Sequence, residues 1–370
     1  MRVVVAPDAF KGTLTARQAA ESVAAGWARA RPGDAVEVVP MSDGGPGFLD
    51  AVAPGLGGEL RETPSSDPLG RPVRARLLLA GDTCYLESAD CCGLHLVPPP
   101  ERNPLHSSST GLAAVLLAAA DTTASRVVVG LGGSATNDGG AGLLAGLGFR
   151  LLDVRDGELP PEPAALGRLA RIAVPRDPPA LPHLVAATDV DSPLLGPHGA
   201  SRMFGPQKGV TPAEVALLEE RLARLAATVG RDLPGAAGAE DRPGAGAAGG
   251  LGYGLFALGA SQVPGAEVVI EATQLRDRVR GAGLVVTGEG AFDRQSLRGK
   301  VVAGVAAVAK RHGVPCVVLA GRVRLGRREA ARAGVRAAYA LEELAGSAAE
   351  ARARAAELLE RLAAQVASGA

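Results

Sequence analysis

The stretch that decides the fold is Val127-Val128-Val129-Gly130-Leu131-Gly132-Gly133-Ser134-Ala135-Thr136-Asn137-Asp138-Gly139-Gly140. Its apolar start predicts a buried strand, and its polar remainder predicts a turn at the carboxyl end of that strand. Glycines let backbone N–H groups approach an anion closely, and the hydroxyls of Ser134 and Thr136 add further donors. The turn is therefore either a phosphate-binding loop or a tight connection that holds no ligand.

A rival interpretation is a dinucleotide-binding loop, because the stretch contains Gly-x-Gly-x-x-Ala starting at Gly130, with Asp153 about where a ribose-binding acid is expected. In that fold the helix begins at the third small residue, here Ala135. Residues 137–140 delay the helix instead and put the carboxylate of Asp138 beside the anion. A carboxylate there calls for Mg²⁺, so the pattern favours phosphoryl transfer over hydride transfer.

The composition limits the class of protein. A chain of 370 residues with 47% hydrophobic residues predicts two domains, each with its own core. The 39 basic and 39 acidic residues give a net charge of zero, which removes any bulk electrostatic case for binding nucleic acid or an anionic membrane. No apolar run reaches membrane-spanning length, and the first residues do not resemble a signal peptide. We therefore expect a cytoplasmic protein that recognises its partners through local sites.

Lysine and asparagine are scarce, which makes their positions informative. Among 39 basic residues only four are lysines, and three of them, Lys11, Lys208 and Lys300, fall in loops marked by glycine or proline. The fourth, Lys310, lies in a helical pattern and is expected on the surface. Arginine and lysine are not interchangeable, so a compact ammonium is expected to be needed at the three loop positions. Asn137, one of two asparagines, lies in the central turn.

Acidic residues follow several predicted strands. Asp8 and Lys11 follow a strand at residues 2–6, Asp43 follows a strand at 36–39, and Asp293 follows a strand at 284–286. Ligands gather at the carboxyl ends of strands in α/β sheets. These loops are therefore candidate ligand-binding segments.

Two acids follow a further strand at residues 183–187, at positions 189 and 191. We favour Asp189 as the acid nearest the chemistry, because strand ends fix side chains well and Asp191 can cap the next turn instead. Arg202, Gln207 and Lys208 lie downstream and could bind an anionic substrate. Residues 235–252 have the composition of a flexible linker, but residues 246–254 lead straight into an apolar helix, so close packing against another backbone is the alternative.

The motifs taken together resemble those of the bacterial class I glycerate kinases over almost the whole chain. The family's APDSFKGSL appears as APDAFKGTL from residue 6, and GLGGSATNDGG is intact from residue 130. FGPQKG is intact from residue 204, GAGAAGGLG from residue 244, and the TGEGxxDxQSxxGK string spans residues 287–300. So many motifs in one order are specific for the family.

The resemblance implies an α/β protein of two domains, a flavodoxin/Rossmann-like parallel-sheet domain and an inserted mixed α/β domain, with the active site in the cleft between them. We expect the first domain at residues 1–60 plus 270–370 and the inserted domain at residues 61–269. The resemblance also implies ATP- and Mg²⁺-dependent phosphorylation of D-glycerate, most often at the 2-hydroxyl. Phosphorylation of the 3-hydroxyl, an NAD(P)-dependent oxidoreductase and a non-catalytic small-acid-binding protein are the alternatives.

We assign predicted roles to residues as follows. The expected catalytic residues are Asp189, Lys208 and Lys300, and the expected ligands of Mg²⁺ are Asp138 and Asp293. The expected substrate- and phosphate-binding residues are Asp8, Lys11, Gly132, Gly133, Ser134, Thr136, Asn137, Arg202 and Gln207. The expected partners are D-glycerate and a nucleotide, with no nucleic acid and no membrane, in a monomer or small homo-oligomer.

Overall fold

A computed structural model describes residues 1–297 and 299–369, and the chain divides into two compact units. Unit 1 comprises residues 1–43, 50–56 and 264–370, and unit 2 comprises residues 44–49 and 57–263. The sequence analysis had placed the boundaries after residues 60 and 269. Each unit contains a sheet and helices, so the α/β class expected from the sequence is confirmed.

Unit 1 is built on a five-stranded parallel sheet with the strand order β13-β12-β11-β1-β2. Its strands are β1 (Arg2–Val5), β2 (Ala35–Val38), β11 (Leu284–Phe292), β12 (Cys316–Val323) and β13 (Ala337–Ala340). Its helices are α1 (Ala16–Ala30), α10 (Gly265–Ala272), α11 (Leu275–Val279), α12 (Val301–Arg311), α13 (Arg327–Arg332), α14 (Ala348–Ala353) and α15 (Ala355–Ser368). Helix α2 (Phe48–Leu56) begins in unit 2 and continues in unit 1.

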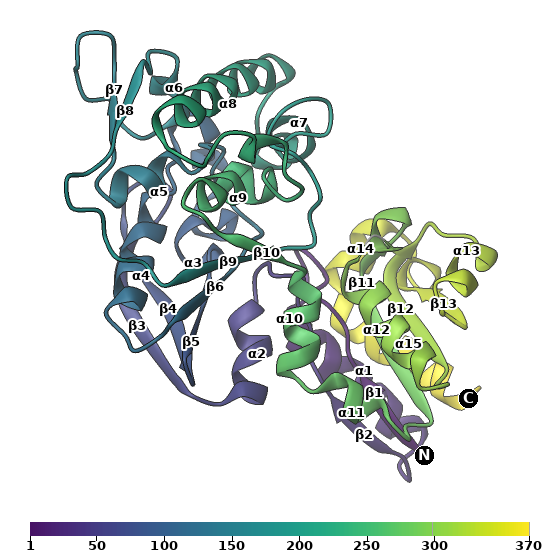
Figure 1. Cartoon of the computed structure of the whole chain (residues 1–370). Helices are drawn as coiled ribbons and strands as arrows, with labels where there is room; N and C mark the ends of the chain where they lie inside the picture. Colours follow the sequence, from purple (N-terminus) through teal and green to yellow (C-terminus); the bar gives the residue numbers. More distant parts are fainter. Residues whose placement is uncertain (298, 370) are drawn as a thin grey trace. The chain divides into compact units, whose positions relative to one another are not determined.

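Numbered by their appearance within unit 1, these strands have the order 2-1-3-4-5 of a flavodoxin-like sheet (Figure 1). The residues of unit 2 are inserted between the second and third strands. In such a sheet the strand order reverses between the first and third strands, here β1 and β11. Ligands bind outside the carboxyl ends of the strands at that point, so the loops after β1 and β11 are the ones to inspect.

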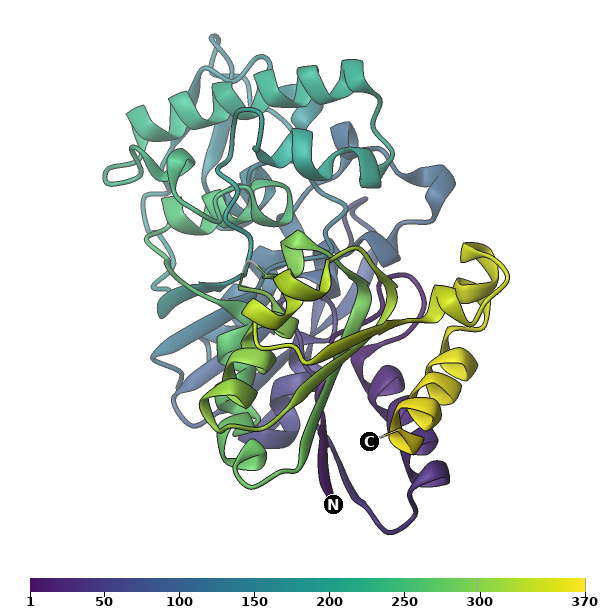
Figure 2. The ribbon, with the colours of Figure 1, turned by 90° about the vertical axis from the view of Figure 1, so that its right-hand side faces the viewer.

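Alternating strand residues build the core of unit 1. Val3, Val5 and Val286 pack in one apolar cluster with α1 and α15, while Val4 and Val285 are equally buried and point to the other face. Figure 2 shows α15, in yellow, beside α1, in purple. Helix α1 begins with a capping box, in which the Thr15 side chain accepts a hydrogen bond from the Gln18 backbone N–H.

Unit 2 is built on a six-stranded sheet with the order β10-β9-β6-β5-β4-β3. The strands are β3 (Glu59–Ser66), β4 (Pro72–Ala80), β5 (Thr83–Glu87), β6 (Arg126–Gly130), β9 (His183–Ala187) and β10 (Ser261–Val263). Strands β3, β4 and β5 form antiparallel hairpins, and β5, β6, β9 and β10 run parallel. The four parallel strands therefore present their carboxyl ends at one edge.

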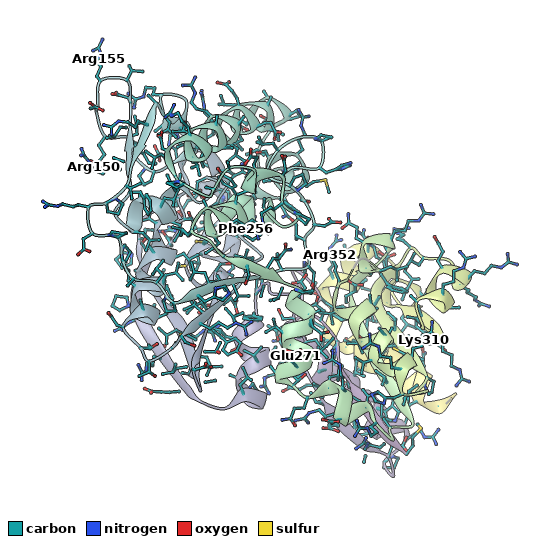
Figure 3. The ribbon with its side chains drawn as sticks, viewed as in Figure 1. Arg150, Arg155, Phe256, Glu271, Lys310 and Arg352 are labelled. Atoms are coloured by element: carbon teal, nitrogen blue, oxygen red, sulfur yellow. The ribbon has the colours of Figure 1, made fainter. Side chains whose placement is uncertain are left out.

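The remaining elements of unit 2 cover this sheet or connect its strands. Its helices are α3 (Ala89–Cys92), α4 (Thr110–Ala120), α5 (Ala141–Gly146), α6 (Pro163–Leu166), α7 (Ala200–Phe204), α8 (Pro212–Asp232) and α9 (Ala247–Ala257). A small antiparallel hairpin, β7 (Arg150–Leu152) and β8 (Arg171–Ala173), carries Arg150 and the exposed Arg155 (Figure 3). Among the residues described, no helix is long and apolar enough to span a membrane.

One local expectation was wrong, and one open alternative is decided by the structure. The strand expected at residues 284–286 continues to Phe292 because its second half pairs with β12. Glu289 consequently lies on a strand and not in a loop. For the glycine-rich residues 246–254 two interpretations were open, and here Ala247 and Gly250 are buried and the segment enters α9. The alternative interpretation, close packing against another backbone, is the one observed.

Candidate functional site

The first candidate site lies at the carboxyl ends of the parallel strands of unit 2. In the register of this sheet, Glu87 at the end of β5 is opposite Gly130 of β6, which is opposite Ala187 of β9. The loops that follow these three residues therefore leave the sheet side by side. The central loop, defined as residues 131–140, is the middle one of the three.

Another part of the chain packs directly on the central loop. A Cβ atom added to Gly132 would lie 2.6 Å from the Cα of Gly45, and one added to Gly133 would lie 2.5 Å from Cγ of Pro46. These glycines are therefore required by the packing of residues 44–48. The role of Gly132 and Gly133 in binding phosphate stays a prediction. Helix α5 begins only at Ala141, so the early helix start that a dinucleotide fold needs at Ala135 is absent.

Glu87 holds the segment that packs on the central loop. Its carboxylate is 4% exposed and accepts hydrogen bonds from the backbone N–H groups of Gly47, at 3.0 Å, and Leu49, at 3.2 Å. Burial, assisted by the charge of Asp90, raises the pKa of Glu87 to about 7. The sequence analysis missed this residue, because an acid at the end of an apolar strand gives no sign of its partners.

Lys208 is buried beside the central loop, only 1% exposed. Its Nζ donates hydrogen bonds to the Ser134 hydroxyl, at 3.0 Å, and to the backbone carbonyl oxygen of Thr136, at 2.5 Å. Burial lowers the pKa of Lys208 to about 7, although Asp138 and Cys92 oppose the shift. Lys208, one of the few lysines of the sequence, therefore lies at the central loop. With a pKa of about 7, its charge changes with pH near neutrality.

Asn137 and Thr136 complete this buried polar cluster. Asn137 Nδ2 donates to the hydroxyl of Ser201 at 2.9 Å, and both Asn137 and Thr136 are 0% exposed. Asn137 Oδ1 and Thr136 Oγ1 make no hydrogen bond with any described residue. A buried polar atom without a partner costs free energy, so these two atoms are suited to receive a polar group from outside the cluster.

Asp138 is fully buried and holds the central loop together. Its carboxylate accepts hydrogen bonds from the backbone N–H and the hydroxyl of Ser109, both at 2.7 Å, and from the N–H groups of Gly140 and Gly142, both at 3.1 Å. Burial raises the pKa of Asp138 despite these donors. A metal ligand role would require the carboxylate to give up some of these bonds, and it stays a prediction.

The start of α9 closes the other side of the cluster. Gly249 has φ +72°, and a Cβ atom there would lie 1.9 Å from the Thr136 carbonyl oxygen and 2.8 Å from Lys208 Nζ. Only glycine fits this approach in this conformation. The glycine-rich segment therefore belongs to the wall around Lys208.

Asp189 follows β9 closely and is half-buried, whereas Asp191 is exposed. Since β9 neighbours β6, the Asp189 loop and the central loop leave the same edge of the sheet. Arg202 lies in α7 and Gln207 in the short turn of residues 206–208, and both side chains are exposed. Lys208, on the same turn as Gln207, points inward instead.

The second candidate site lies at the carboxyl ends of β1, β2 and β11 in unit 1. It comprises Asp8, Lys11, Asp43 and Glu289. Lys11 Nζ lies 3.7 Å from an Asp43 carboxylate oxygen, and the side chains of the two residues are 72% and 18% exposed. Asp8 is 7% exposed and accepts a hydrogen bond from the N–H of Ala9. This edge therefore gathers three carboxylates around one ammonium group.

Crowding and burial shift the titration of these acids. Burial, and then the charge of Asp43, raise the pKa of Asp8 well above its ordinary value, with Glu289 adding to the shift. Burial raises the pKa of Glu289 to about 7, against the charges of Lys300 and Lys11. Asp43 is in turn the main cause of the raised pKa of Lys11. The group is therefore electrostatically coupled and sits where the strand order of the sheet reverses.

Asp293 and Lys300 follow β11 on the same side of this sheet. Asp293 is half-buried and its Oδ1 accepts a hydrogen bond from the Gln295 N–H at 2.8 Å. Lys300 is the N-cap residue of α12 and is half-buried. Lys310 lies near the other end of α12 and is exposed, as its helical pattern predicted (Figure 3).

The expected site residues thus form two groups on two units. Asp138, Asp189 and Lys208 belong to unit 2, whereas Asp8, Lys11, Asp293 and Lys300 belong to unit 1. Glu87, Glu289 and Ser201 were not predicted from the sequence. Glu289 could have been found, because it is one of the two acids of the TGEGxxDxQSxxGK string at residues 287–300. Among the residues described, no group of three or more His, Cys, Asp or Glu side chains could hold a metal ion by itself.

Comparisons with known proteins agree over nearly the whole chain. A model of the glycerate kinase family matches residues 3–369. A glycerate kinase of Halalkalibacterium halodurans is 41% identical, covering 92% of this chain and 90% of that protein. A glycerate 2-kinase of Escherichia coli is 39% identical over 87% of this chain and 85% of its own length. A crystal structure of a protein named as a glycerate kinase 2 from Salmonella typhimurium superposes with a TM-score of 0.76 at 35% identity, covering 100% and 98% of the two chains.

Proposed function

The chain belongs to the glycerate kinase family, and on this premise we propose that it transfers the γ-phosphoryl group of ATP, with Mg²⁺, to the 2-hydroxyl of D-glycerate. The coarser activity, phosphorylation of glycerate, rests on the family. The identity of the phosphoryl donor as ATP, the need for Mg²⁺ and the choice of the 2-hydroxyl are proposed in addition to that activity. We also propose that the protein is cytoplasmic and acts as a monomer or a small homo-oligomer.

The observation that carries this proposal is the common edge from which the Asp189 loop and the central loop leave the sheet of unit 2. Phosphoryl transfer requires mainly that the nucleophile be held in line and that negative charge be stabilised. Asp189 supplies a carboxylate to orient the attacking hydroxyl or accept its proton. The central loop and Lys208 supply donors for a negatively charged group.

The two buried atoms without hydrogen-bond partners support a substrate that carries hydroxyl groups as well as a charge. Asn137 Oδ1 can only accept a hydrogen bond, and Thr136 Oγ1 can donate or accept one. A hydroxy acid offers both a hydroxyl donor and carboxylate acceptors. The exposed Arg202 and Gln207 are proposed to guide the anionic substrate toward this edge.

For Mg²⁺ the donor set fits a nucleotide-bound ion. Mg²⁺ is commonly held by one or two carboxylates together with substrate phosphates and water, so it does not need a group of three protein ligands. Asp293 is half-buried, and its charge raises the pKa of Glu289, which places two carboxylates near each other after β11. When bound, the ion would neutralise charge on the phosphates. Asp293 is the proposed ligand, and Asp138 would serve only by exchanging its present donors.

A coupled assay for ADP release tests the proposal directly. The full-length protein should release ADP only when ATP, Mg²⁺ and D-glycerate are all present. Folded protein that releases none would contradict phosphorylation and favour a non-catalytic acid-binding protein. Fluorescence enhancement on titration with NADPH would favour the oxidoreductase instead.

A further inference from the structure

Four arginines lie between the end of strand β12 and the first turn of helix α13 in unit 1. This segment, called the arginine loop, comprises residues 322–328, contains no acid, and carries Arg322, Arg324, Arg327 and Arg328. All four side chains are exposed. None of them forms an ion pair or a side-chain hydrogen bond with a residue that the structure describes, whereas nearby Arg294 pairs with Glu329. The loop therefore presents a concentrated positive charge on a chain whose net charge is zero.

The arginine loop lies at the carboxyl edge of the parallel sheet. Arg322 is opposite Ala291 in the register of β12 and β11, and the Arg324 N–H donates to the Phe292 carbonyl oxygen. The pairing of β12 with β13 already ends at Ala320. Arg322 and Arg324 therefore extend beyond the body of the sheet, and, two residues apart on extended backbone, they point to the same side.

The other charged groups of this edge are the carboxylates of Asp8, Asp43, Glu289 and Asp293 and the ammonium groups of Lys11 and Lys300. Lys11 pairs with Asp43. Among the residues described, no arginine of the arginine loop forms an ion pair with any of these carboxylates. A guanidinium group binds phosphate oxygens with two parallel N–H donors and keeps its charge at every physiological pH. Several of them together match a ligand that carries several negative charges.

The buried cluster of unit 2 offers a different balance. It contains one lysine, Lys208, with a pKa of about 7 and with the carboxylate of Asp138 nearby. One ammonium group matches the single charge of a small carboxylic acid and not the three or four charges of a nucleoside triphosphate. The two ligands of a kinase are thus distinguished by the charge that each unit presents.

We propose that the arginine loop binds the polyphosphate of the nucleotide, which assigns the nucleotide to the edge of unit 1. The inference rests on the proposed function, since it takes the second substrate to be a nucleoside triphosphate. Arg322 and Arg324 make the main contacts, and Arg327 and Arg328 add charge that raises the local concentration of the anion.

The test is calorimetric titration of the full-length protein with Mg²⁺ and a non-hydrolysable ATP analogue, in the wild type and in an Arg322→Ala/Arg324→Ala double variant. Arg352→Ala is the matched control, because Arg352 of α14 is an exposed arginine of the same unit without an ion pair to a described residue (Figure 3). We expect the Kd of the double variant to rise at least tenfold and that of the control to stay within twofold. With added salt, the affinity of the wild type for the analogue should fall more steeply than that of the double variant.

Steady-state kinetics distinguish the two proposals. The double variant should raise the KM for ATP and leave the KM for D-glycerate unchanged. Unchanged binding of the analogue, or a raised KM for D-glycerate alone, would overturn the arginine assignment while leaving kinase activity intact. A wild type that binds the analogue but does not phosphorylate glycerate would overturn the proposed function, and the binding comparison would still decide the role of the arginine loop.

Discussion

The central loop of unit 2 and the carboxylate edge of unit 1 begin alike in sequence, with a strand followed by glycine and acid, yet they end in opposite states. In unit 2, Asp138 and Lys208 are at most 1% exposed and Asp138 bonds only to the protein around it. In unit 1, the Lys11 side chain is 72% exposed and faces Asp43. One region is a closed polar cluster, and the other combines a buried acid, Asp8, with an exposed ammonium group, Lys11.

The difference comes from segments far away in the sequence. Residues 44–48 and Gly249 pack on the central loop, and glycine at the contact points lets backbone approach backbone. Among the residues described, no segment covers the Lys11 side chain in this way, since it is 72% exposed. A polar loop after a strand can therefore be either a scaffold or a ligand-facing edge, and packing decides which. The predictions below test this contrast, from the largest expected effect to the smallest.

The largest effect should come from filling the contact that closes the unit 2 cluster. Gly249→Ala would force a Cβ atom against the Thr136 carbonyl oxygen and Lys208 Nζ in a left-handed conformation, so we expect a loss of about 3 kcal/mol or more in the free energy of unfolding. Gly299→Ala in unit 1 is the control, because its Cβ would meet nothing within 4 Å and only the positive φ would cost about 1 kcal/mol. Urea unfolding measures the free energy lost in each variant. Equal losses in the two variants would contradict the contrast between the two regions.

A catalytic effect of about 100-fold is expected at Asp189, which lies at the edge of the closed cluster. Asp189→Asn should lower kcat more than it weakens binding, because the carboxylate positions the nucleophile. Asp191→Asn, at an exposed position two residues on, should stay near wild type. Measurement of kcat at saturating ATP and glycerate decides, and a large fall for Asp191→Asn with little change for Asp189→Asn would reverse the assignment.

Replacing lysine by arginine compares the two regions directly. Lys208→Arg should cost about 2 kcal/mol of transition-state stabilisation, or roughly 30-fold in kcat/KM, because the larger guanidinium cannot keep both hydrogen bonds in a buried space. Lys300→Arg should show a smaller loss, since Lys300 is only half-buried. Wild-type kinetics for Lys208→Arg would show that the compact ammonium is not required.

The smallest effects are expected in the pH dependence of stability. The pKa of Glu289 is raised from 4.5 to about 7, so the folded state binds its proton more tightly and stability falls as the pH rises from 4.5 to 7. The pKa of Lys208 is lowered from 10.5 to about 7, so stability rises between pH 7 and 10.5. Glu289→Gln should lessen the fall, and Lys208→Met should remove the rise.

Urea unfolding of both variants and the wild type at pH 5, 7 and 9 measures these slopes. The pKa of Glu87 is also raised to about 7, so stability depends on pH in this range even without Glu289. The slope of each variant is therefore compared with the slope of the wild type. Slopes that match the wild type in both variants would contradict the assigned titrations.

The sequence predicted the parts of the fold that local patterns control. The Thr-x-x-Gln pattern at Thr15 and the Thr-Pro-x-Glu pattern at Thr211 predict capping boxes, and alternation with turn residues from about residue 61 to 87 predicts hairpins. Both are present in the structure. The extension of β11 to Phe292 could not be predicted in this way. It depends on pairing with β12, and a Thr-Gly-Glu-Gly sequence has no strand preference of its own.

The candidate site shows the same division. Scarcity drew attention to Lys208, and its contact with Ser134 joins two motifs that are 74 residues apart. The burial of this cluster could not be predicted. It depends on Pro46 and Gly249, which come from other parts of the chain and pack against the central loop. Glu87 was missed for the same reason, since its function lies in the two N–H groups that it holds.

The measurement that tests the central claim most directly is ³¹P and ¹H NMR of the product formed from D-glycerate, ATP and Mg²⁺ by the full-length protein. The account predicts a single new phosphate ester whose phosphorus couples to the proton on C2, together with one ADP for each ester formed. An ester on C3 would contradict the proposed acceptor hydroxyl. No ester at all from folded protein would contradict the proposed function.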